Sequence, residues 1–475
     1  MSNSKRTKII ATLGPSSNSP EVMEKLILEG VDVFRINFSH ANYKDASKRI
    51  SLIRKLSAKL NIHVSILVDL QGPKLRIGEI KKNSEVKEGS LVTFSSSKPF
   101  IGDSKKAYMT YKKFASDVKI GETILLDDGK LIFEVVKSDK KENVTAKVIQ
   151  GGSFNSNKGV NLPNTKISLP ALTKKDIEDA IFAIKQEVDW IALSFVRKKE
   201  DLIELRELIE KYSIHKIPII SKIEKPEALV NLSEIINNSD GLMVARGDLG
   251  VELPAAEVPL IQKKLVLKAK EARIPIIIAT QMMETMIETR TATRAEVNDV
   301  ANSVMDGADA VMLSAETSVG KFPVEVIKTM SSILVSVEGS DLIKVPNLPP
   351  KIKTKRYITK SICYHASIMA NEIGAKAICT LTNSGYTAFQ ISAWRPISNI
   401  LVFTSNKRIL SQLNLLWGVK SFFYDAYEST DKTVEQINRI AKKYNLVSKG
   451  DFLINLTSMP LKSKGMVNTL RVSEI

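Results

Sequence analysis

The amino-acid sequence predicts an α/β protein in which a (β/α)8 TIM barrel is interrupted after its third strand by an all-β domain and followed by a C-terminal α/β domain. Three observations predict this fold: eight short apolar runs that alternate with helical patterns, one long segment of different composition between the third and fourth runs, and a proline-rich stretch before a last group of strands and helices. The chain of 475 residues is too long for one hydrophobic core, and its apolar content of 43% is sufficient for several.

The eight apolar runs have the length and composition of buried strands. Their near-continuous apolarity is typical of parallel strands that are covered on both faces. Intervening segments, such as 21–30, 200–212 and 260–272, carry apolar residues at helical spacing, so the repeating unit is a strand followed by a helix. Eight such units predict a closed barrel. The predicted strands are residues 8–14, 33–38, 64–70, 189–195, 218–223, 241–247, 275–280 and 309–314.

The segment between the third and fourth strands is far longer than a loop that joins a strand to a helix. It contains stretches of alternating apolar and polar residues, and Asp128-Gly129 is a strong hairpin signal within it. We therefore expect an inserted all-β domain. Strand and helix patterns resume after the proline-rich residues 347–355, and they predict a C-terminal domain with a parallel sheet. The predicted bounds are 1–73 and 170–342 for the barrel, 74–169 for the inserted domain and 343–475 for the C-terminal domain.

The net charge of +17 lies outside the predicted barrel. The two barrel segments together carry −2, whereas the inserted and C-terminal segments carry +7 and +12. This distribution favours a solvated basic surface, with an anion or effector site in the last domain as the more specific alternative. A basic nucleic-acid-binding protein is a competing interpretation, but the near-neutral barrel and the lack of a DNA- or RNA-binding motif argue against it.

Cysteine content and hydropathy indicate a cytoplasmic protein without a membrane partner. The two cysteines, Cys363 and Cys379, lie in no CxxC or Cys/His spacing, so neither a disulfide framework nor a zinc site is predicted. No apolar run approaches the roughly 20 residues that span a bilayer. The first residues also lack the long apolar stretch of a signal peptide.

Ionisable residues follow several predicted strands, at the carboxyl ends where barrels of this type have their active sites. Lys222 and Glu224 alternate at one strand end and so face the same side, and Asp248 follows the next strand. Two carboxylates from neighbouring strand ends suit Mg²⁺, while Lys222 and the planar fork of Arg35 suit a phosphate group. Gly247 would let backbone N–H groups approach an anion. The sequence therefore predicts phosphoryl transfer at a Mg²⁺ site.

Each of these residues also has a purely structural interpretation. Lys222 and Glu224 alone would make an ion pair at the mouth of a barrel, and Arg35 or Thr280 would cap a helix. The convergence of several strand ends on one set of cations and carboxylates favours the functional interpretation.

Seven segments, taken in order, resemble the signatures of the pyruvate kinase family: TKIIATLGPSS, FRINFSH, DLQGPKLRIG, SKIEKPEAL, MVARGDLGVE, IIATQMMETM and DAVMLSAETSVGKFPVE. The resemblance implies transfer of the phosphoryl group of phosphoenolpyruvate to ADP, which gives pyruvate and ATP in the final step of glycolysis. It also implies a homotetramer and a β-barrel lid formed by the inserted domain. A Mg²⁺-dependent aldolase or lyase of the phosphoenolpyruvate/pyruvate barrel type is the alternative, but it needs no nucleotide and no lid.

The resemblance implies a role for individual residues. Arg35 corresponds to the phosphate-binding arginine, Lys222 to the group that stabilises charge on the phosphoryl group, and Thr280 to a contributor to protonation. Glu224 and Asp248 correspond to the ligands of Mg²⁺ or Mn²⁺. The positions that match substrate contacts are Arg35, Lys222, Gly247, Asp248 and Thr280, and those that match nucleotide contacts are Asn37, His40, Arg76 and Lys198.

The resemblance also bears on K⁺. The family's K⁺ ligands correspond to Asn37, Ser39, Asp69 and the backbone carbonyl of Leu70. Potassium-dependent members carry Thr at the position of Leu70 and Glu at that of Lys74. This chain therefore resembles potassium-independent members, in which the ammonium of Lys74 would take the place of the cation.

Two further departures concern regulation and the start of the chain. Residues 382–387 resemble the phosphate-gripping effector loop, but Asn383 stands where members regulated by fructose 1,6-bisphosphate often carry a basic residue, and residues 457–465 lack the family's usual Trp-Arg pair. Control by that sugar phosphate is not expected, whereas another sugar phosphate or a nucleotide stays open. The chain begins almost at its first strand, so the N-terminal extension of longer members is expected to be missing.

Overall fold

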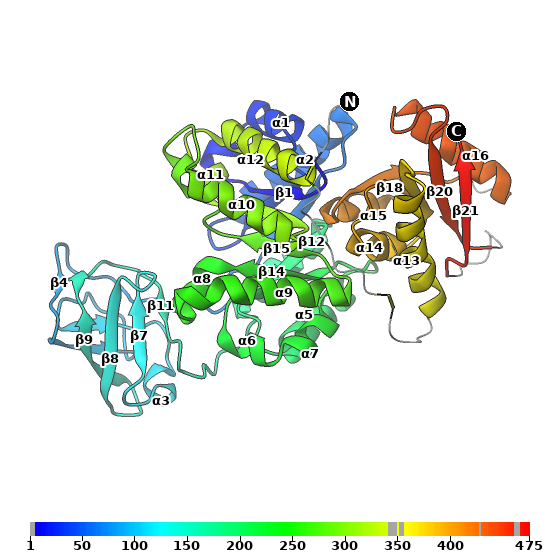
Figure 1. Cartoon of the computed structure of the whole chain (residues 1–475). Coiled ribbons are helices and arrows are strands. Elements are labelled where there is room, and N and C mark those ends of the chain that lie inside the picture. Colours follow the sequence, from blue (N-terminus) through cyan, green and yellow to red (C-terminus); the bar gives the residue numbers. More distant parts are fainter. Residues whose placement is uncertain (1–4, 341–348, 351–355, 427–428, 460–465) are drawn as a thin grey trace.

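The computed structural model describes residues 5–340, 349–350, 356–426, 429–459 and 466–475. Its central part is a closed barrel of eight parallel strands, β1 (Lys8–Thr12), β2 (Val33–Asn37), β3 (Ser65–Asp69), β12 (Trp190–Leu193), β13 (Ile219–Ile223), β14 (Gly241–Ala245), β15 (Ile276–Ala279) and β16 (Ala310–Leu313). They follow one another around the barrel in chain order, and β16 pairs with β1 to close it (Figure 1). Every strand lies inside its predicted range, so the predicted barrel is confirmed.

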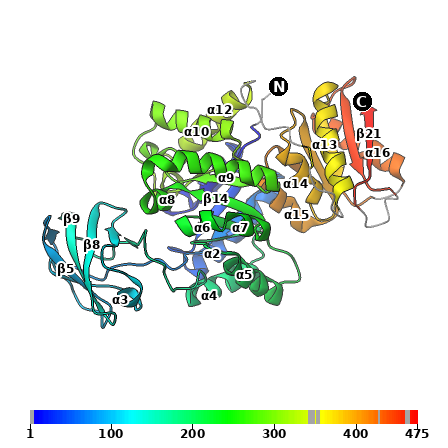
Figure 2. The same ribbon diagram turned by 60° about the horizontal axis from the view of Figure 1, so that its bottom comes forward.

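Helices surround this barrel because each has one apolar face that packs on the strands (Figures 1 and 2). They begin at side chains suited to that position: Thr173 and Thr293, for example, cap two of them in reciprocal hydrogen bonds with Asp176 and Glu296. The helices are α1 (Pro20–Leu28), α2 (Tyr43–Leu60), α4 (Lys174–Lys185), α5 (Lys199–Tyr212), α6 (Pro226–Val230), α7 (Leu232–Asn238), α8 (Arg246–Glu252), α9 (Val258–Ala272), α10 (Arg294–Asp306), α11 (Ala315–Ser318) and α12 (Pro323–Glu338), with short 3₁₀ turns η1 (Pro15–Ser17), η2 (Ala255–Glu257) and η3 (Glu284–Ile287).

The inserted domain extends away from the barrel in both ribbon views and has its own core, which includes Phe94, Phe114 and Phe133 (Figures 1 and 2). Its strands are β4 (Glu85–Val86), β5 (Leu91–Ser95), β6 (Lys106–Tyr108), β7 (Thr123–Leu126), β8 (Leu131–Ser138), β9 (Asn143–Gln150), β10 (Gly152–Ser153) and β11 (Val160–Asn161). They form a six-stranded sheet, β11-β7-β8-β9-β5-β6, and the pair β10-β4. The predicted hairpin at Asp128-Gly129 is confirmed, but the short helix α3 (Phe114–Asp117) was not predicted.

The C-terminal domain is built on a five-stranded sheet in the order β19-β18-β17-β20-β21. Its elements are α13 (Tyr357–Glu372), β17 (Ala377–Leu381), α14 (Tyr386–Ala393), β18 (Asn399–Thr404), α15 (Lys407–Gln412), η4 (Leu413–Leu415), β19 (Val419–Phe423), α16 (Thr430–Lys443), β20 (Phe452–Thr457) and β21 (Thr469–Glu474). Four strands are parallel, as predicted, whereas the edge strand β21 is antiparallel to β20. The predicted linker at 347–355 lies outside the described residues except for Pro349 and Pro350, so the domain bounds stay a prediction.

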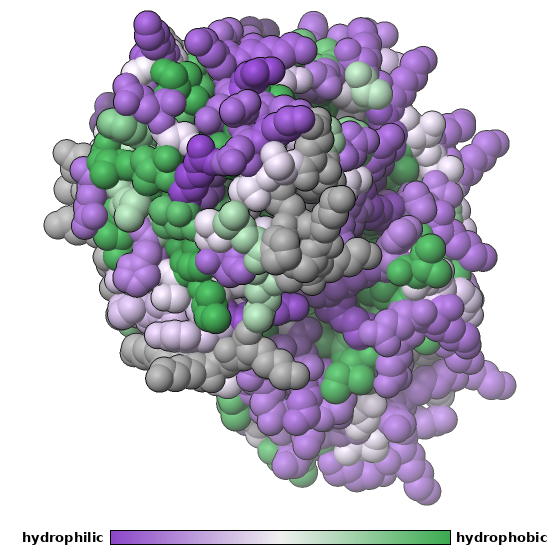
Figure 3. Space-filling view, turned by 90° about the vertical axis from the view of Figure 1, so that its right-hand side faces the viewer, coloured by the Kyte–Doolittle hydropathy of each residue, from purple (hydrophilic) through white to green (hydrophobic). Residues whose placement is uncertain are grey.

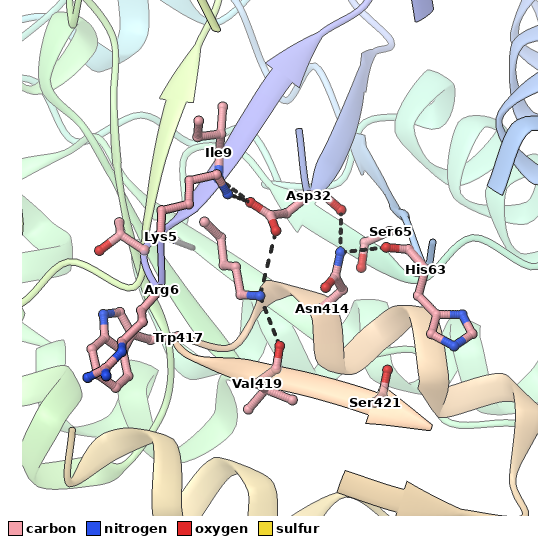
Figure 4. Close-up of polar contacts among 12 residues, drawn as sticks. Lys5, Arg6, Ile9, Asp32, His63, Ser65, Asn414, Trp417, Val419 and Ser421 are labelled. Atoms are coloured by element: carbon pink, nitrogen blue, oxygen red, sulfur yellow. Dashed lines mark hydrogen bonds and ion pairs between the residues drawn. The ribbon is translucent and has the colours of Figure 1, made fainter. Parts of the chain in front are cut away.

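The C-terminal domain docks on the amino-terminal end of the barrel (Figure 4). Lys8 donates from Nζ to the carbonyl oxygen of Val419 at 3.0 Å and lies 3.6 Å from Asp32 Oδ1. Asn414 donates from Nδ2 to the carbonyl oxygens of Asp32 at 2.9 Å and His63 at 2.7 Å. Leu415 is buried among the side chains inside the barrel. This docking leaves the carboxyl ends of the strands open.

The surface on the side of the C-terminal domain is mainly hydrophilic, with small groups of hydrophobic residues between the hydrophilic ones (Figure 3). Exposed hydrophobic side chains of that domain include Tyr444, Phe452 and Val472. In the part of the chain that the structure describes, no helix combines the length and the apolar character needed to cross a bilayer.

Candidate active site

Lys222 lies near the end of β13 between two carboxylates. Its Nζ is 3.2 Å from Asp69 Oδ1 and 2.9 Å from Glu224 Oε1, and it donates to Ser194 Oγ at 2.7 Å. The residue is only 9% exposed. Burial lowers the pKa of Lys222, but the negative charges of Asp69 and Glu224 outweigh this effect and raise it above its usual value. The buried ammonium therefore stays charged at neutral pH.

Asp69 also holds the second cation of the site. Arg35 donates from Nε to Asp69 Oδ2 at 2.7 Å and from Nη1 to Thr12 Oγ1 at 3.0 Å. Burial raises the pKa of Asp69, but the charges of Lys222 and Arg35 lower it by more, so the carboxylate is ionised. One buried carboxylate thus fixes Arg35 and Lys222 side by side at the mouth of the barrel. The sequence placed Asp69 at a strand end but did not predict this pairing.

Glu224 and Asp248 form the carboxylate pair that the sequence predicted. Glu224 Oε2 accepts a hydrogen bond from the Phe195 N–H at 2.7 Å, while the buried Oε1 forms the ion pair with Lys222 at 2.9 Å. Asp248 lies in the first turn of α8. The pKa of Glu224 is raised, first by burial and then by the charge of Asp248, against the opposing charge of Lys222.

This arrangement fits a divalent cation. A cation between the two carboxylates would relieve their repulsion and would add a second positive charge beside Glu224, whose Oε1 already contacts Lys222. Among the described residues, no three or more His, Cys, Asp or Glu side chains converge on one point. A bound Mg²⁺ would therefore complete its shell with substrate oxygens and water, as this ion commonly does.

Thr280 lies in a strained turn after β15. Thr280 and Gln281 have φ angles of +73° and +55°, which are unfavourable for a β-branched residue such as threonine. Contacts with the start of α8 hold this turn: the Gly247 N–H donates to Thr280 Oγ1 at 2.7 Å, and Arg246 donates from Nη2 to the Thr280 carbonyl oxygen at 2.8 Å. The hydroxyl itself donates to the Ala279 carbonyl oxygen at 2.6 Å. Its position beside Gly247 is therefore fixed.

Of the four predicted nucleotide positions, Asn37 ends β2, His40 follows it, and Arg76 follows β3 at the entry to the inserted domain. Asn37 Oδ1 accepts a hydrogen bond from the Ser39 N–H at 3.1 Å. The pKa of His40 is lowered, first by burial and then by the positive charges of Arg76, Lys74 and Arg35. Arg76 donates from Nη1 to the carbonyl oxygen of Asn157 in the inserted domain at 2.9 Å. Lys198, the fourth position, is exposed at the start of α5.

The predicted K⁺ ligands are engaged by protein groups. The carbonyl oxygen of Leu70 accepts a hydrogen bond from Ser194 Oγ at 2.7 Å, and both oxygens of Asp69 face cations. Lys74 is exposed and forms no ion pair with any described residue. It lines a cleft of about 890 Å³, together with Asp128 of the inserted domain and Gly247 of the barrel. Replacement of K⁺ by Lys74 therefore stays a prediction.

Several residues that shape the site were not predicted. Ser194 connects Lys222 to the Leu70 carbonyl, Thr12 orients Arg35, and Arg246 holds the Thr280 turn. A signal was present for two of them, since Thr12 and Ser194 also lie at the carboxyl ends of predicted strands.

Fold and site together define a (β/α)8-barrel enzyme whose buried cations and paired carboxylates suit phosphoryl transfer. The family model described as "Pyruvate kinase, barrel domain" matches residues 4–327, and "Pyruvate kinase, alpha/beta domain" matches residues 360–473. The chain belongs to the pyruvate kinase family.

Similar proteins extend over the whole chain. A pyruvate kinase from Clostridium perfringens is 38% identical over 99% of this chain and 100% of its own length, and one from Corynebacterium efficiens is 41% identical over 98% and 97%. The crystal structure of a pyruvate kinase from Cryptosporidium parvum superposes with a TM-score of 0.92 at 33% identity, over 99% of this chain and 96% of that chain. These similarities support phosphoryl transfer from phosphoenolpyruvate to ADP and do not favour the aldolase or lyase alternative. The family implies a divalent metal and usually K⁺.

Proposed function

We propose that Lys222 and Arg35 catalyse phosphoryl transfer from phosphoenolpyruvate to ADP in this protein. The observation that supports this proposal is the shared carboxylate of Asp69, which holds both cations side by side and charged. A terminal phosphate oxygen of ADP attacks phosphorus while the bond from phosphorus to the enol oxygen breaks. Negative charge develops on the oxygens of the phosphoryl group during this step, and two fixed cations stabilise it without reorganisation.

The remaining groups bind and protonate the three-carbon unit. Glu224 and Asp248 would hold Mg²⁺ or Mn²⁺, which neutralises negative charge on substrate oxygens when bound. The start of α8 at Gly247 and Asp248 would bind pyruvate and its enol form, because the first N–H groups of a helix have no acceptor within the helix. The Thr280 hydroxyl, fixed beside Gly247 at 2.7 Å from its nitrogen, contributes to protonation of enolpyruvate.

The nucleotide would bind in the cleft beneath the inserted domain. Asn37, His40, Arg76 and Lys198 are the proposed contacts, because the positive charge of Arg76 acts on His40 and Arg76 belongs to the segment that enters the inserted domain. Closure of that domain over the cleft would exclude water from the transfer.

We also propose a homotetramer and a cytoplasmic location, both of which rest on family membership. The exposed edge strand β21, with Val472 41% exposed, offers one surface for a second copy. The domain bounds 1–73 with 170–342, 74–169 and 343–475 are also proposed, because the strands of the barrel, of the inserted domain and of the C-terminal sheet fall within these ranges.

An assay of pyruvate release with and without ADP tests the proposed reaction. With phosphoenolpyruvate and Mg²⁺ present, pyruvate should form only when ADP is added, and ATP should form in equal amount. Release of pyruvate without ADP would instead indicate a lyase, and no release in either condition would refute the proposed function.

The same assay without monovalent metal ions tests the role of Lys74. We expect near-full activity in K⁺-free buffer, because the Lys74 ammonium would supply the missing charge when the cleft closes. Replacement of this exposed side chain in Lys74→Met should lower the activity in K⁺-free buffer and make it respond to KCl. Strong stimulation of the unmodified protein by KCl at constant ionic strength would contradict this proposal.

A further inference from the structure

The carboxylate of Glu252, the last residue of α8, joins three segments around the proposed metal site. Its side chain is 0% exposed. Lys225 lies 2.6 Å from Glu252 Oε1, and Asn161 donates from Nδ2 to the same oxygen at 2.9 Å. Lys225 follows β13 of the barrel, and Asn161 ends β11 of the inserted domain. The end of β13, helix α8 and the inserted domain thus meet at the buried Oε1 of Glu252.

Two of these segments carry the proposed metal ligands. Lys225 directly follows Glu224, and Glu252 lies four residues after Asp248, one turn along α8. The ion pair between Lys225 and Glu252 therefore connects the end of β13, which bears Glu224, to helix α8, which bears Asp248. The start of α8 is held by the contacts of Arg246 and Gly247 with Thr280, and Glu252 holds its other end.

Stability alone does not explain a buried ion pair at this position. Removing two charges from water costs about as much as their attraction returns, and well-packed apolar side chains of similar volume often give equal or higher stability. Glu252 Oε2 is in addition one of the buried oxygens without a hydrogen bond from the described residues, which adds to the cost. A role in fixing geometry accounts for the pair where a stabilising role does not.

The third segment brings in the inserted domain. Asn161 pairs with β7 in the main sheet of that domain, and its hydrogen bond to Glu252 crosses to the barrel. Lys225, Glu252 and Asn161 line the same small cavity as Asp248 and Lys74, between the inserted domain and the barrel. The hydrogen bond of Asn161 thus connects β11 directly to the end of α8.

We propose that Glu252 is a positioning residue: through Lys225 it sets the spacing of Glu224 and Asp248, and through Asn161 it couples that spacing to the inserted domain. This inference rests on the proposed metal site of the phosphoryl-transfer reaction. It assigns a function to three residues that touch neither the proposed metal nor the phosphoryl group.

Electron paramagnetic resonance can measure the affinity of the substrate-free protein for Mn²⁺. This affinity reports the positioning of the two carboxylates without relying on activity. Glu252→Gln keeps the shape of the side chain and removes its charge. We expect Mn²⁺ affinity to fall at least about tenfold and kcat to fall with it, since a misplaced ligand weakens metal binding by about 10- to 100-fold. The matched control is Asp240→Asn, which removes a largely buried partner of Arg206 and Lys216 at the other end of the barrel. It should lower thermal stability and leave Mn²⁺ affinity unchanged.

Two further variants separate positioning from stability. The double variant Lys225→Met/Glu252→Leu removes both charges and should regain thermal stability relative to Glu252→Gln, while Mn²⁺ affinity stays low. Asn161→Ala should leave Mn²⁺ affinity of the free protein unchanged and raise the KM for ADP several-fold, because only the connection to the inserted domain is lost.

Wild-type Mn²⁺ affinity in Glu252→Gln, or recovery of that affinity in the double variant, would overturn the inference even if the unmodified protein is an active kinase. An unmodified protein that binds Mn²⁺ but forms no pyruvate from phosphoenolpyruvate and ADP would instead refute the proposed function.

Discussion

Lys222→Met should lower kcat for pyruvate formation by about 10³-fold or more while the protein stays folded. The variant removes the fixed positive charge that we propose contacts the phosphoryl group in transfer, and removal of one such group typically costs 10²- to 10⁵-fold in rate. Methionine has nearly the same length as lysine and fits a buried site. The KM for phosphoenolpyruvate should change much less, since Arg35 and the proposed metal ligands remain. Steady-state kinetics and thermal unfolding of the same preparations provide the two measurements.

The matched control for this variant is Lys8→Met. Lys8 is another buried lysine, 5% exposed, and it pairs with Asp32 at the opposite end of the barrel. Its replacement should lower stability and leave turnover close to that of the unmodified protein. Near-normal turnover of Lys222→Met would refute the role assigned to Lys222.

Asp69→Asn should lower both stability and turnover. Asparagine keeps the shape of the side chain, but it leaves Arg35 and Lys222 close together without their shared counter-charge. Breaking a buried ion pair on one side costs about 3–5 kcal/mol, so a clear shift of the denaturation midpoint is expected. We expect kcat to fall by about 10²-fold, because two mutually repelling cations no longer keep their positions.

Asp309→Asn is the control for Asp69→Asn. Asp309 is 2% exposed and pairs with Lys270 and Arg395, where the C-terminal domain docks. The Asp309→Asn variant should lose about as much stability as Asp69→Asn, with little direct effect on kcat. If Asp69→Asn loses stability and keeps full turnover, then Asp69 does not position the two cations of the site.

The pH dependence of stability follows from the same carboxylate. Folding lowers the pKa of Asp69, although burial acts in the opposite direction. A carboxyl group with a lowered pKa contributes stability above its unfolded pKa of about 3.9, and this contribution is lost as the pH falls through the lower pKa of the folded state. Asp69→Asn should therefore be less sensitive to acid than the unmodified protein below pH 4.

The barrel was predictable because its signal is local. Each strand is a run of four or five residues buried on both faces, and burial on both faces requires continuous apolarity. Glu224 and Asp248 were predictable for a related reason, since side chains at the ends of neighbouring parallel strands must meet at one edge. The antiparallel direction of β21 was not predicted, because the composition of a strand does not indicate its direction relative to its neighbour.

The contacts of the site were less predictable than its residues. Strand alternation predicted the directions of the Lys222, Glu224 and Arg35 side chains. Asp69 was expected only as a K⁺ ligand, whereas in the structure it is the shared partner of two cations. The positive φ angle of Thr280 could not be predicted, because threonine seldom adopts one. The hydrogen bonds from Gly247 and Arg246 stabilise this conformation here.

The sequence by itself thus determined the order of strands and helices, the place of the insertion and the set of ionisable groups at the strand ends, because hydrophobic periodicity and strand alternation act over a few residues. Only the tertiary structure decided which of these groups pair. Asp69 and Lys222 are 153 positions apart, and Asn161 meets Glu252 from another domain. Such pairs depend on how the barrel closes and on where the inserted domain is attached, and no local pattern encodes either.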